Sequence, residues 1–215
     1  SYTLQIGQIK ASRTTTFNPK IRAEIDKSPV YCIDEKASTG MCREIDRTRE
    51  TEDTLGGVFE VVATGVPIGL GSYVQWDRRL DAHLASALMS IPGVKAVEIG
   101  EGIKISGEKG SDVHDEIFTK IETRKKFCRY YRKTNRAGGI EGGVTNGEEV
   151  IIRAYIKPIP TLINPLYSVD FSSKKETKAL YQRSDICIVP AASIVGEAVT
   201  AWEIAIAFLE KFSSD

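Results

Sequence analysis

The sequence is poor in the residues that usually hold a metal ion. It has 215 residues but only two histidines, His83 and His114, and neither lies close to a second candidate ligand. Its four cysteines include no Cys-x-x-Cys pair. We therefore predict no metal site, and we assign catalysis to neither histidine. Scattered cysteines without such pairs indicate reduced thiols in the cytoplasm.

An excess of charge of one sign is also absent, since 29 lysines and arginines are matched by 29 aspartates and glutamates. Proteins that bind nucleic acid or anionic membrane surfaces usually carry a basic excess. Neither partner is expected for this chain. The span 117–131 is locally basic, and we interpret it as a solvated hairpin or insertion rather than a nucleic-acid contact.

A hydrophobic run typical of a membrane span is lacking as well. The most apolar segment, 191–212, is interrupted by Glu197, Glu203 and Glu210, so we interpret it as a buried amphipathic helix. Residues 1–7 lack the charged start and apolar run of a signal peptide, and the chain lacks an initiator methionine. We therefore expect a processed or truncated chain.

Glycine and proline are concentrated in two segments that stand close together in the sequence. Residues 135–147 contain five glycines in thirteen residues, so their backbone can approach a flat or charged ligand without interference from Cβ atoms. Ten residues later, Lys-Pro-Ile-Pro-Thr at 157–161 offers one cation and one hydroxyl at a rigid bend, which suits a phosphate group. An apolar stretch joins the two, so both could serve one pocket for a phosphorylated, ring-shaped cofactor. A pair of tight turns would explain the same residues.

Hydrophobic periodicity predicts a mixture of strands and helices. The alternation in 150–156 gives one apolar face, and Leu80, Leu84, Leu88 and Ile91 fall on one face of a helix. The other expected elements are strands at 4–9, 58–64, 94–99 and 186–189, loop or turn at 18–29, and helices at 39–55 with Thr39 as N-cap, from Asp77 as N-cap to about 91, and at 191–212.

The order of these elements indicates a single α/β domain over residues 1–215. A strand, a loop with proline or glycine and a helix occur twice, in 58–91 and in 150–212. An internal duplication of this strand–loop–helix unit remains open, although no residue-level repeat is visible.

Seven motifs follow one another along the chain. They are Gly-x-Pro-x-Gly-Leu-Gly at 65–71, Leu-Asp-Ala-x-Leu-Ala at 80–85, Met-Ser-Ile at 89–91, Val-Lys-x-Val-Glu-Ile-Gly at 94–100, the Gly-rich run at 135–147, Lys-Pro-x-Pro-Thr at 157–161 and Arg-Ser-Asp-x-Cys at 183–187. In this order they resemble the chorismate synthase family, and the resemblance extends over essentially all 215 residues.

The resemblance implies an enzyme of the shikimate pathway, which supplies aromatic amino acid biosynthesis. Family members convert 5-enolpyruvylshikimate 3-phosphate to chorismate and phosphate by 1,4-anti elimination. They need reduced FMN, with NADPH as a candidate reductant. The family fold is an αβ sandwich with a helical layer between antiparallel sheets, here incomplete. A cytoplasmic homotetrameric lyase is the corresponding expectation.

The sequence departs from the family pattern in three places. A common form has Arg-His-Asp followed by Pro-Arg, whereas this chain has Arg183-Ser184-Asp185 and then Pro-Ala at 190–191, which resembles one branch of the family. His83 replaces a family aspartate, and we take this change as neutral. The Gly-Glu-Ser-His-Gly motif, the catalytic histidines and the Arg-Ser-Ser flavin motif of the family's N-terminal segment do not occur. The chain thus resembles the C-terminal portion, and we expect it not to turn over substrate at a normal rate alone.

In the family the Lys-Pro-x-Pro-Thr loop contacts FMN, and the resemblance carries this role to five residues here. Lys157 would act electrostatically and Thr161 by donating its hydroxyl. Pro158, Ile159 and Pro160 would complete the contact. A strand that ends in a proline-containing turn would account for the same residues.

Three further positions resemble flavin-contacting residues of the family. Gly142 would let the backbone lie against the ring, although a turn with positive φ would also require glycine. Pro92 and Gly93 would contact flavin through backbone or apolar surface. Helix termination explains these two equally well.

The motif at 183–185 supplies the candidate catalytic groups. Arg183 would grip a phosphate or carboxylate by bidentate hydrogen bonds. Asp185 resembles the residue that tunes proton transfer, through N5 of the flavin, and Ser184 would hold substrate or flavin by a hydrogen bond. A local salt bridge between Arg183 and Asp185 is the plain alternative.

Two other functions are compatible with these residues. One is a non-catalytic module that binds flavin or phosphate, and the other is an oligomer-assembly fragment whose strand and helix faces pair with copies of itself. FMN binding is expected for the first and not for the second.

Overall fold

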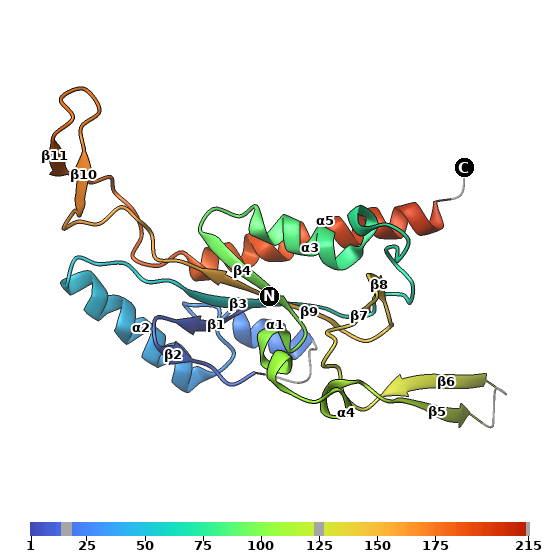
Figure 1. Ribbon diagram of the computed structural model, residues 1–215. Coiled ribbons are helices and arrows are strands. Elements are labelled where there is room, and N and C mark those ends of the chain that lie inside the picture. The colour runs from blue at the N-terminus through green and yellow to red at the C-terminus, as the bar shows by residue number, and fades with distance from the viewer. Residues whose placement is uncertain (14–18, 123–126, 214–215) are drawn as a thin grey trace. The chain divides into compact units, whose positions relative to one another are not determined.

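The computed structural model describes residues 1–13, 19–122 and 127–213, and its fold is α+β (Figure 1). The largest sheet has five strands in the order β2-β1-β3-β9-β4, which are Ile9–Lys10, Tyr2–Ile6, Gly57–Ala63, Val150–Ile156 and Val94–Ile99. Two-stranded sheets are formed by β5 and β6 (Ile117–Glu122, Phe127–Arg132), β7 and β8 (Ile140–Glu141, Val144–Thr145), and β10 and β11 (Tyr167–Val169, Glu176–Lys178). The α-helices are α1 Pro19–Ile25, α2 Glu35–Glu50, α3 Leu80–Met89, α4 Gly110–Val113 and α5 Val189–Phe212, and the 3-10 helices are η1 Trp76–Arg78 and η2 Gly102–Gly107.

The chain divides into two compact units. Unit 1 comprises Ser1–Glu60, Ile91–Ala96 and Ala154–Gly196, and unit 2 comprises Val61–Ser90, Val97–Arg153 and Glu197–Asp215. Strands β3, β4 and β9 and helix α5 each pass from one unit into the other along the chain.

Unit 1 is built around β1, which pairs antiparallel with β2 and β3. Tyr2, Ile6 and Phe59 are fully buried in its core. The Tyr2 hydroxyl donates a hydrogen bond to the buried Glu60, whose carboxylate also pairs with Arg13 at 3.1 Å. Because Glu60 has both a hydrogen-bond donor and a cation as partners, its charge is compensated inside the protein.

Unit 2 contains α3, which buries the predicted apolar face of Leu80, Leu84 and Leu88. A second buried feature joins two strands, since Arg153 on β9 and Glu98 on β4 form an ion pair at 2.7 Å. Burying both partners together leaves neither charge stranded in a low-dielectric interior.

Most of the predicted elements are confirmed. The segments predicted at 58–64, 94–99, 150–156 and 191–212 correspond to β3, β4, β9 and α5, and the observed ends agree with the predicted ends within one or two residues. Ile91 is buried like the three leucines before it. The basic span 117–131 contains the hairpin of β5 and β6, with Ile117 opposite Arg132. Residues 123–126 of the span lie outside the described residues.

Three predictions for short segments are wrong. The segment predicted as loop contains α1, which starts with Pro19 at a position where a missing N–H costs nothing, while residue 18 lies outside the described part. The strand predicted at 4–9 is interrupted at Gly7, whose φ of 55° turns the chain between β1 and β2. No strand occupies 186–189 in the described structure, because Cys187 forms an isolated bridge and α5 already begins at Val189.

Both predicted N-caps are wrong as well. Helix α2 begins four residues before Thr39, and its cap is Asp34, which accepts a hydrogen bond from the N–H of Ala37 at 3.0 Å. The Thr39 hydroxyl instead donates to the carbonyl of Glu35 within the helix. Asp77 lies in η1, ahead of α3, and α3 has no side-chain cap.

Helix α5 is less buried than predicted. Only 28% of its most apolar 18-residue window is buried, and Trp202, Leu209 and Phe212 are at least half exposed. By length and composition alone α5 could cross a bilayer, but core helices of globular proteins pass the same test.

Candidate functional site

The predicted phosphate-binding loop leaves the sheet at the end of β9. Val150, Ile152, Ala154 and Ile156 are buried, and the exposed Lys157 follows directly. The loop 157–161 then continues with prolines at 158 and 160, which fix φ and remove two backbone donors.

Gly93 lies against the start of this loop. The N–H of Lys157 donates to the carbonyl of Gly93 at 2.9 Å. Gly93 has a φ of 89°, a backbone conformation that residues other than glycine adopt only with strain. The Pro92-Gly93 pair thus ends α3 and also lies beside the Lys157 loop, so both interpretations of these two residues are compatible with the structure.

The motif at 183–185 meets the other end of the loop. The Ser184 hydroxyl donates to the carbonyl of Thr161 at 3.0 Å. Unit 1 therefore brings together three motifs: Pro92 and Gly93, the loop 157–161, and Arg183 to Asp185. More than 60 residues separate the first from the second, and more than 20 separate the second from the third.

The charged side chains of these motifs face solvent. Lys157, Arg183 and Asp185 are all exposed, and none forms an ion pair with another of the residues that the structure describes. The salt bridge between Arg183 and Asp185 that would make the motif merely structural is not formed. Two cations near a hydroxyl-bearing loop are thus available for an anionic ligand.

Gly142 belongs to unit 2 and forms a tight turn. Ile140 pairs with Thr145 and Glu141 with Val144, which leaves Gly142 and Gly143 as a two-residue hairpin loop. Both have positive φ, 61° and 87°, as such loops require. A Cβ at Gly142 would meet no atom within 4 Å, so its outer face is open. Its predicted contact with the same flavin stays a prediction.

The Gly-rich run is anchored at its start by the buried Asp115. This carboxylate accepts hydrogen bonds from the N–H groups of Arg136 and Ala137, both at 2.9 Å, and from the Thr134 hydroxyl at 2.6 Å. Burial alone would raise the pKa of Asp115, but these bonds outweigh it and hold the pKa below its ordinary value.

A family model described as chorismate synthase matches residues 1–209.

The chain belongs to the chorismate synthase family.

Curated relatives include the chorismate synthase of Desulforamulus reducens, 52% identical over 215 residues, and that of Brevibacillus brevis, 54% identical over 212 residues. These matches cover 100% and 99% of this chain but only 54% of each relative. A crystal structure of chorismate synthase matches with a TM-score of 0.80 and 36% identity, over 100% of this chain and 57% of that chain.

These findings confirm the resemblance to the chorismate synthase family and the α+β class. The chain spans about half the length of the curated relatives that it matches. The roles of individual site residues, the cofactors and the assembly stay predictions.

Sequence reasoning missed the residues beneath the Lys157 loop. Thr54 donates its hydroxyl to the carbonyl of Ile159 at 2.7 Å, and the N–H of Leu55 donates to the carbonyl of Ile186 at 2.7 Å. The available signal is the Gly-Gly pair at 56–57, which directly follows the helix expected at 39–55 and is also typical of a helix end. Close packing against another backbone is the second reason for glycine at such a position.

Three cysteines whose side chains the structure describes have a pKa raised by burial. Cys32, Cys42 and Cys187 are free, and burial raises the pKa of Cys32 to about 11. Burial also raises the pKa of Cys187, two residues after Asp185. Since the thiolate is the reactive form, Cys187 is a poor nucleophile at neutral pH. No described group of three His, Cys, Asp or Glu residues is arranged to hold a metal ion.

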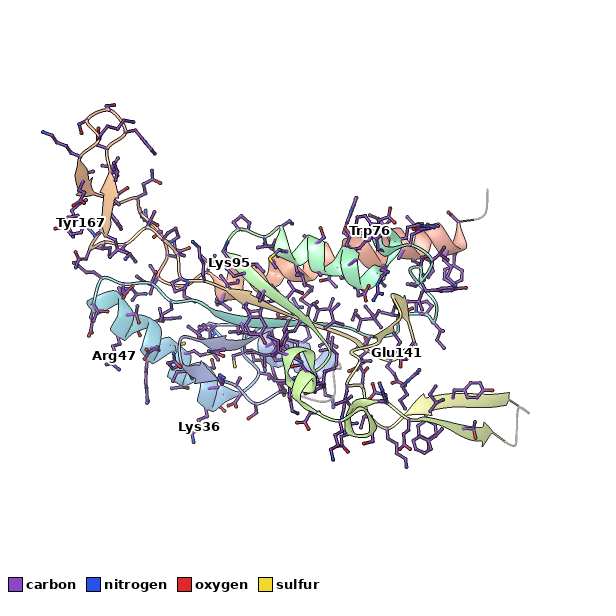
Figure 2. All side chains as sticks on the ribbon, viewed as in Figure 1. Lys36, Arg47, Trp76, Lys95, Glu141 and Tyr167 are labelled. Atoms are coloured by element: carbon purple, nitrogen blue, oxygen red, sulfur yellow. The ribbon has the colours of Figure 1, made fainter. Side chains whose placement is uncertain are left out.

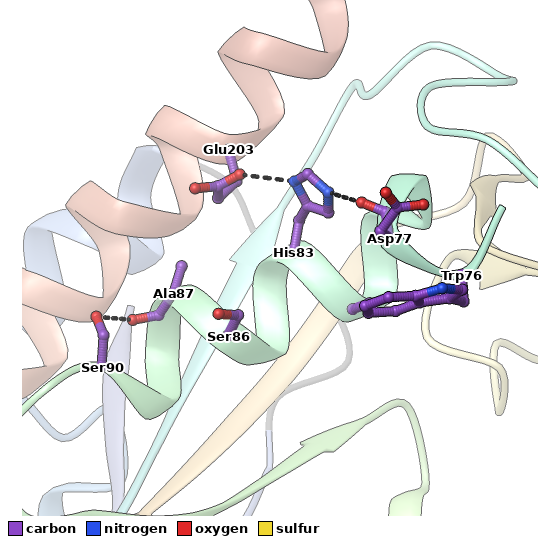
Figure 3. Close-up of a pocket in the computed structure, with 8 residues that line it drawn as sticks. Trp76, Asp77, His83, Ser86, Ala87, Ser90 and Glu203 are labelled. Carbon is purple, nitrogen blue, oxygen red and sulfur yellow. Dashed lines mark hydrogen bonds and ion pairs between the residues drawn. The ribbon is translucent and has the colours of Figure 1, made fainter.

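A pocket of about 430 Å³ lies in unit 2, and none of the predicted site residues lines it (Figure 3). His83 at its centre is partly exposed, as predicted for a helix-surface residue, and its Nε2 lies 2.6 Å from the carbonyl oxygen of Asp77. Its Nδ1 lies 3.4 Å from Glu203 on α5, a partner that sequence spacing does not reveal. The lining residues are Trp76, Asp77, Ala82, His83, Ser86, Ala87, Ser90 and Glu203.

Proposed function

We propose that this chain forms the flavin- and phosphate-binding part of a chorismate synthase. This lyase converts 5-enolpyruvylshikimate 3-phosphate to chorismate and phosphate by 1,4-anti elimination with reduced FMN. The observation that carries the proposal is the contact of three separate motifs in unit 1, through the bonds from Lys157 to Gly93 and from Ser184 to Thr161.

The residues of these motifs fit a phosphorylated ring. Lys157 offers an exposed cation that forms no ion pair with a described residue, and Thr161 offers a hydroxyl donor in the same loop. Pro92, Gly93, Pro158, Ile159 and Pro160 would supply backbone and apolar surface against the flavin. Gly142, in unit 2, is proposed separately as a flavin contact through its open face.

The motif at 183–185 would act on the substrate. Bound reduced FMN would supply electron density that assists loss of phosphate and, at N5, a base for the C6 proton. Arg183 would hold a phosphate or carboxylate of the substrate by a bidentate pair, and Asp185 would tune the proton transfer near N5. The Ser184 hydroxyl already donates to Thr161, so towards a ligand it would act as an acceptor.

We extend the proposal to a cytoplasmic homotetramer with NADPH as a candidate reductant and with no nucleic-acid or membrane partner. Because the chain spans about half the length of its relatives, we also propose that normal turnover needs the residues of those relatives that it does not cover.

An anaerobic assay of chorismate formation tests this function. The 215-residue chain with reduced FMN and substrate should not turn over at a normal rate. Supplying the remaining part of a relative should restore turnover, and Asp185→Asn should then lower kcat about tenfold or more while Asp112→Asn, on α4, changes it little. Wild-type-like activity of the chain alone would contradict the requirement for that part. No activity in either form would favour a binding module.

The assembly alternative is favoured by one observation, the exposed apolar side chains Trp202, Leu209 and Phe212 on α5. An assembly fragment would form oligomers without binding FMN. Lys157→Ala separates the alternatives, because it should weaken FMN in an enzyme part or a binding module and change nothing in an assembly fragment.

A further inference from the structure

Residues Thr54, Leu55 and Gly56 contact two of the three motifs at once. Thr54 donates its hydroxyl to the carbonyl of Ile159, the central residue of the Lys157 loop. The N–H of Leu55 donates to the carbonyl of Ile186, next to Asp185, and Leu55 forms a parallel bridge with Cys187. We call residues 54–56 the brace.

Gly56 allows the loop to lie directly on the brace. A Cβ at Gly56 would lie 2.3 Å from the carbonyl oxygen of Ile156 and 2.9 Å from the nitrogen of Pro158. Both are backbone atoms that cannot move aside as a flexible side chain could. Any residue other than glycine would therefore push the start of the loop away from the brace.

The loop needs an outside partner because its own backbone is short of hydrogen-bond donors. Pro158 and Pro160 have no N–H, and the carbonyl of Ile159 lies between them. Thr54 supplies a donor at 2.7 Å from a side chain that is 8% exposed. Lys157 and Thr161 lie two residues to either side of Ile159, so a backbone shift at Ile159 would displace both.

We propose that Thr54 is a positioning residue that holds the Lys157 loop in register with the motif at 183–185, so that cation and hydroxyl converge on one phosphate group. This inference rests on the proposed function for the identity of the phosphate, which is that of FMN. The brace itself makes no contact with the ligand in this account.

Thr54→Val tests the proposal, because valine keeps the branched shape and removes the hydroxyl. We expect hydrogen–deuterium exchange of the Lys157 and Leu55 amides, which donate to Gly93 and Ile186, to become about fivefold to tenfold faster, as loss of one supporting hydrogen bond implies. FMN affinity should fall by a similar factor and riboflavin affinity by less than twofold, since riboflavin lacks the phosphate. Thr54→Ser should restore both values.

A matched control is Ser38→Ala in the same unit, which removes the buried hydrogen bond between Ser38 and Ser28 (2.8 Å) without touching the loop. It should leave exchange of the Lys157 and Leu55 amides and the ratio of FMN to riboflavin affinity unchanged. Thr54→Ala serves the same comparison if valine prevents folding.

Exchange of the Lys157 and Leu55 amides that stays within twofold of wild type in Thr54→Val would overturn the proposal. So would an equal loss of FMN and riboflavin affinity when the wild-type protein prefers FMN. A wild-type protein with no preference for FMN would instead contradict the proposed function, and the exchange measurement would still decide the role of Thr54.

Discussion

At the level of single residues, Asp115 and Thr54 each hydrogen-bond the backbone of one of two candidate ligand-binding loops. Asp115 accepts two backbone N–H groups and one hydroxyl at the start of the Gly-rich run, and Thr54 donates to a carbonyl in the Lys157 loop. Both are buried and lie outside the motifs. Because both side chains are buried, loss of either removes a hydrogen-bond partner from backbone groups that have little access to water.

For Asp115→Asn we expect a loss of about 1–3 kcal/mol in the free energy of unfolding. The asparagine amide offers one oxygen, so one of its NH₂ hydrogens must face a donor that the carboxylate satisfies. Urea unfolding checks this, with Asp112→Asn, an exposed neighbour on α4, as the control. Equal unfolding free energies for Asp115→Asn and the control would contradict this role.

Neither residue could be predicted from local patterns. The hydroxyl of Thr54 and the carbonyl of Ile159 are 105 residues apart, and Asp115 reaches residues 19 to 22 positions away. The motif residues themselves, such as Lys157 and Arg183, could be predicted because their order along the chain is characteristic. What joins them in space depends on how β9, β4 and the segment after α2 meet.

At the level of elements, α2 shows how one cap decides where a helix starts. Asp34 accepts from the N–H of Ala37, and also from the N–H of Ser12 at 3.1 Å. These bonds, with that from Ala37 the largest cause, hold the pKa of Asp34 below its ordinary value. The ionised carboxylate is therefore more favourable in the folded chain than in the unfolded one.

Asp34→Ala should lower the free energy of unfolding by about 1 kcal/mol at neutral pH. Since the folded-state pKa is depressed, this contribution is complete above the ordinary pKa near 4 and is lost as the pH falls below it. Urea unfolding at pH 7 and near pH 3 checks both parts. Asp34→Asn, which keeps a capping oxygen, should cost little at pH 7, and a pH-independent cost for Asp34→Ala would argue against the carboxylate as the cap.

Periodic segments were predictable and short or end-defined ones were not. The alternation of Val150, Ile152, Ala154 and Ile156 fixes β9 because one face must be buried. The N-cap of α2 was missed because Thr39 and Asp34 are both residue types that cap helices. Only the packing of the folded chain selects between them. The exposure of α5 was missed because an apolar helix predicts burial without naming the surface that provides it.

At the level of the whole molecule, the chain covers 54% of the length of each of two relatives, and about half of the aligned residues are identical. Exposed apolar side chains are frequent at three places, the segment 68–76, the end of α5 and the segment 162–182 with β10 and β11. Figure 2 shows Tyr167 on that hairpin; it is 75% exposed, and the Nζ of Lys178 lies 4.2 Å from its ring centre. Large exposed apolar surface is typical of proteins that bury it against further protein. This agrees with the proposal that the chain acts together with the residues of its relatives that it does not cover.

The most direct test of the central claim is the ratio of FMN to riboflavin affinity, measured by titration on the wild-type protein, Lys157→Ala and Lys36→Ala. Lys36 is an exposed lysine on α2 in the same unit (Figure 2). We expect wild type and Lys36→Ala to prefer FMN, and Lys157→Ala to lose about tenfold for FMN and little for riboflavin, because only FMN carries a phosphate for the cation to hold. Equal affinities for the two flavins in the wild-type protein, or an unchanged preference in Lys157→Ala, would contradict the assignment of the Lys157 loop to the phosphate of FMN.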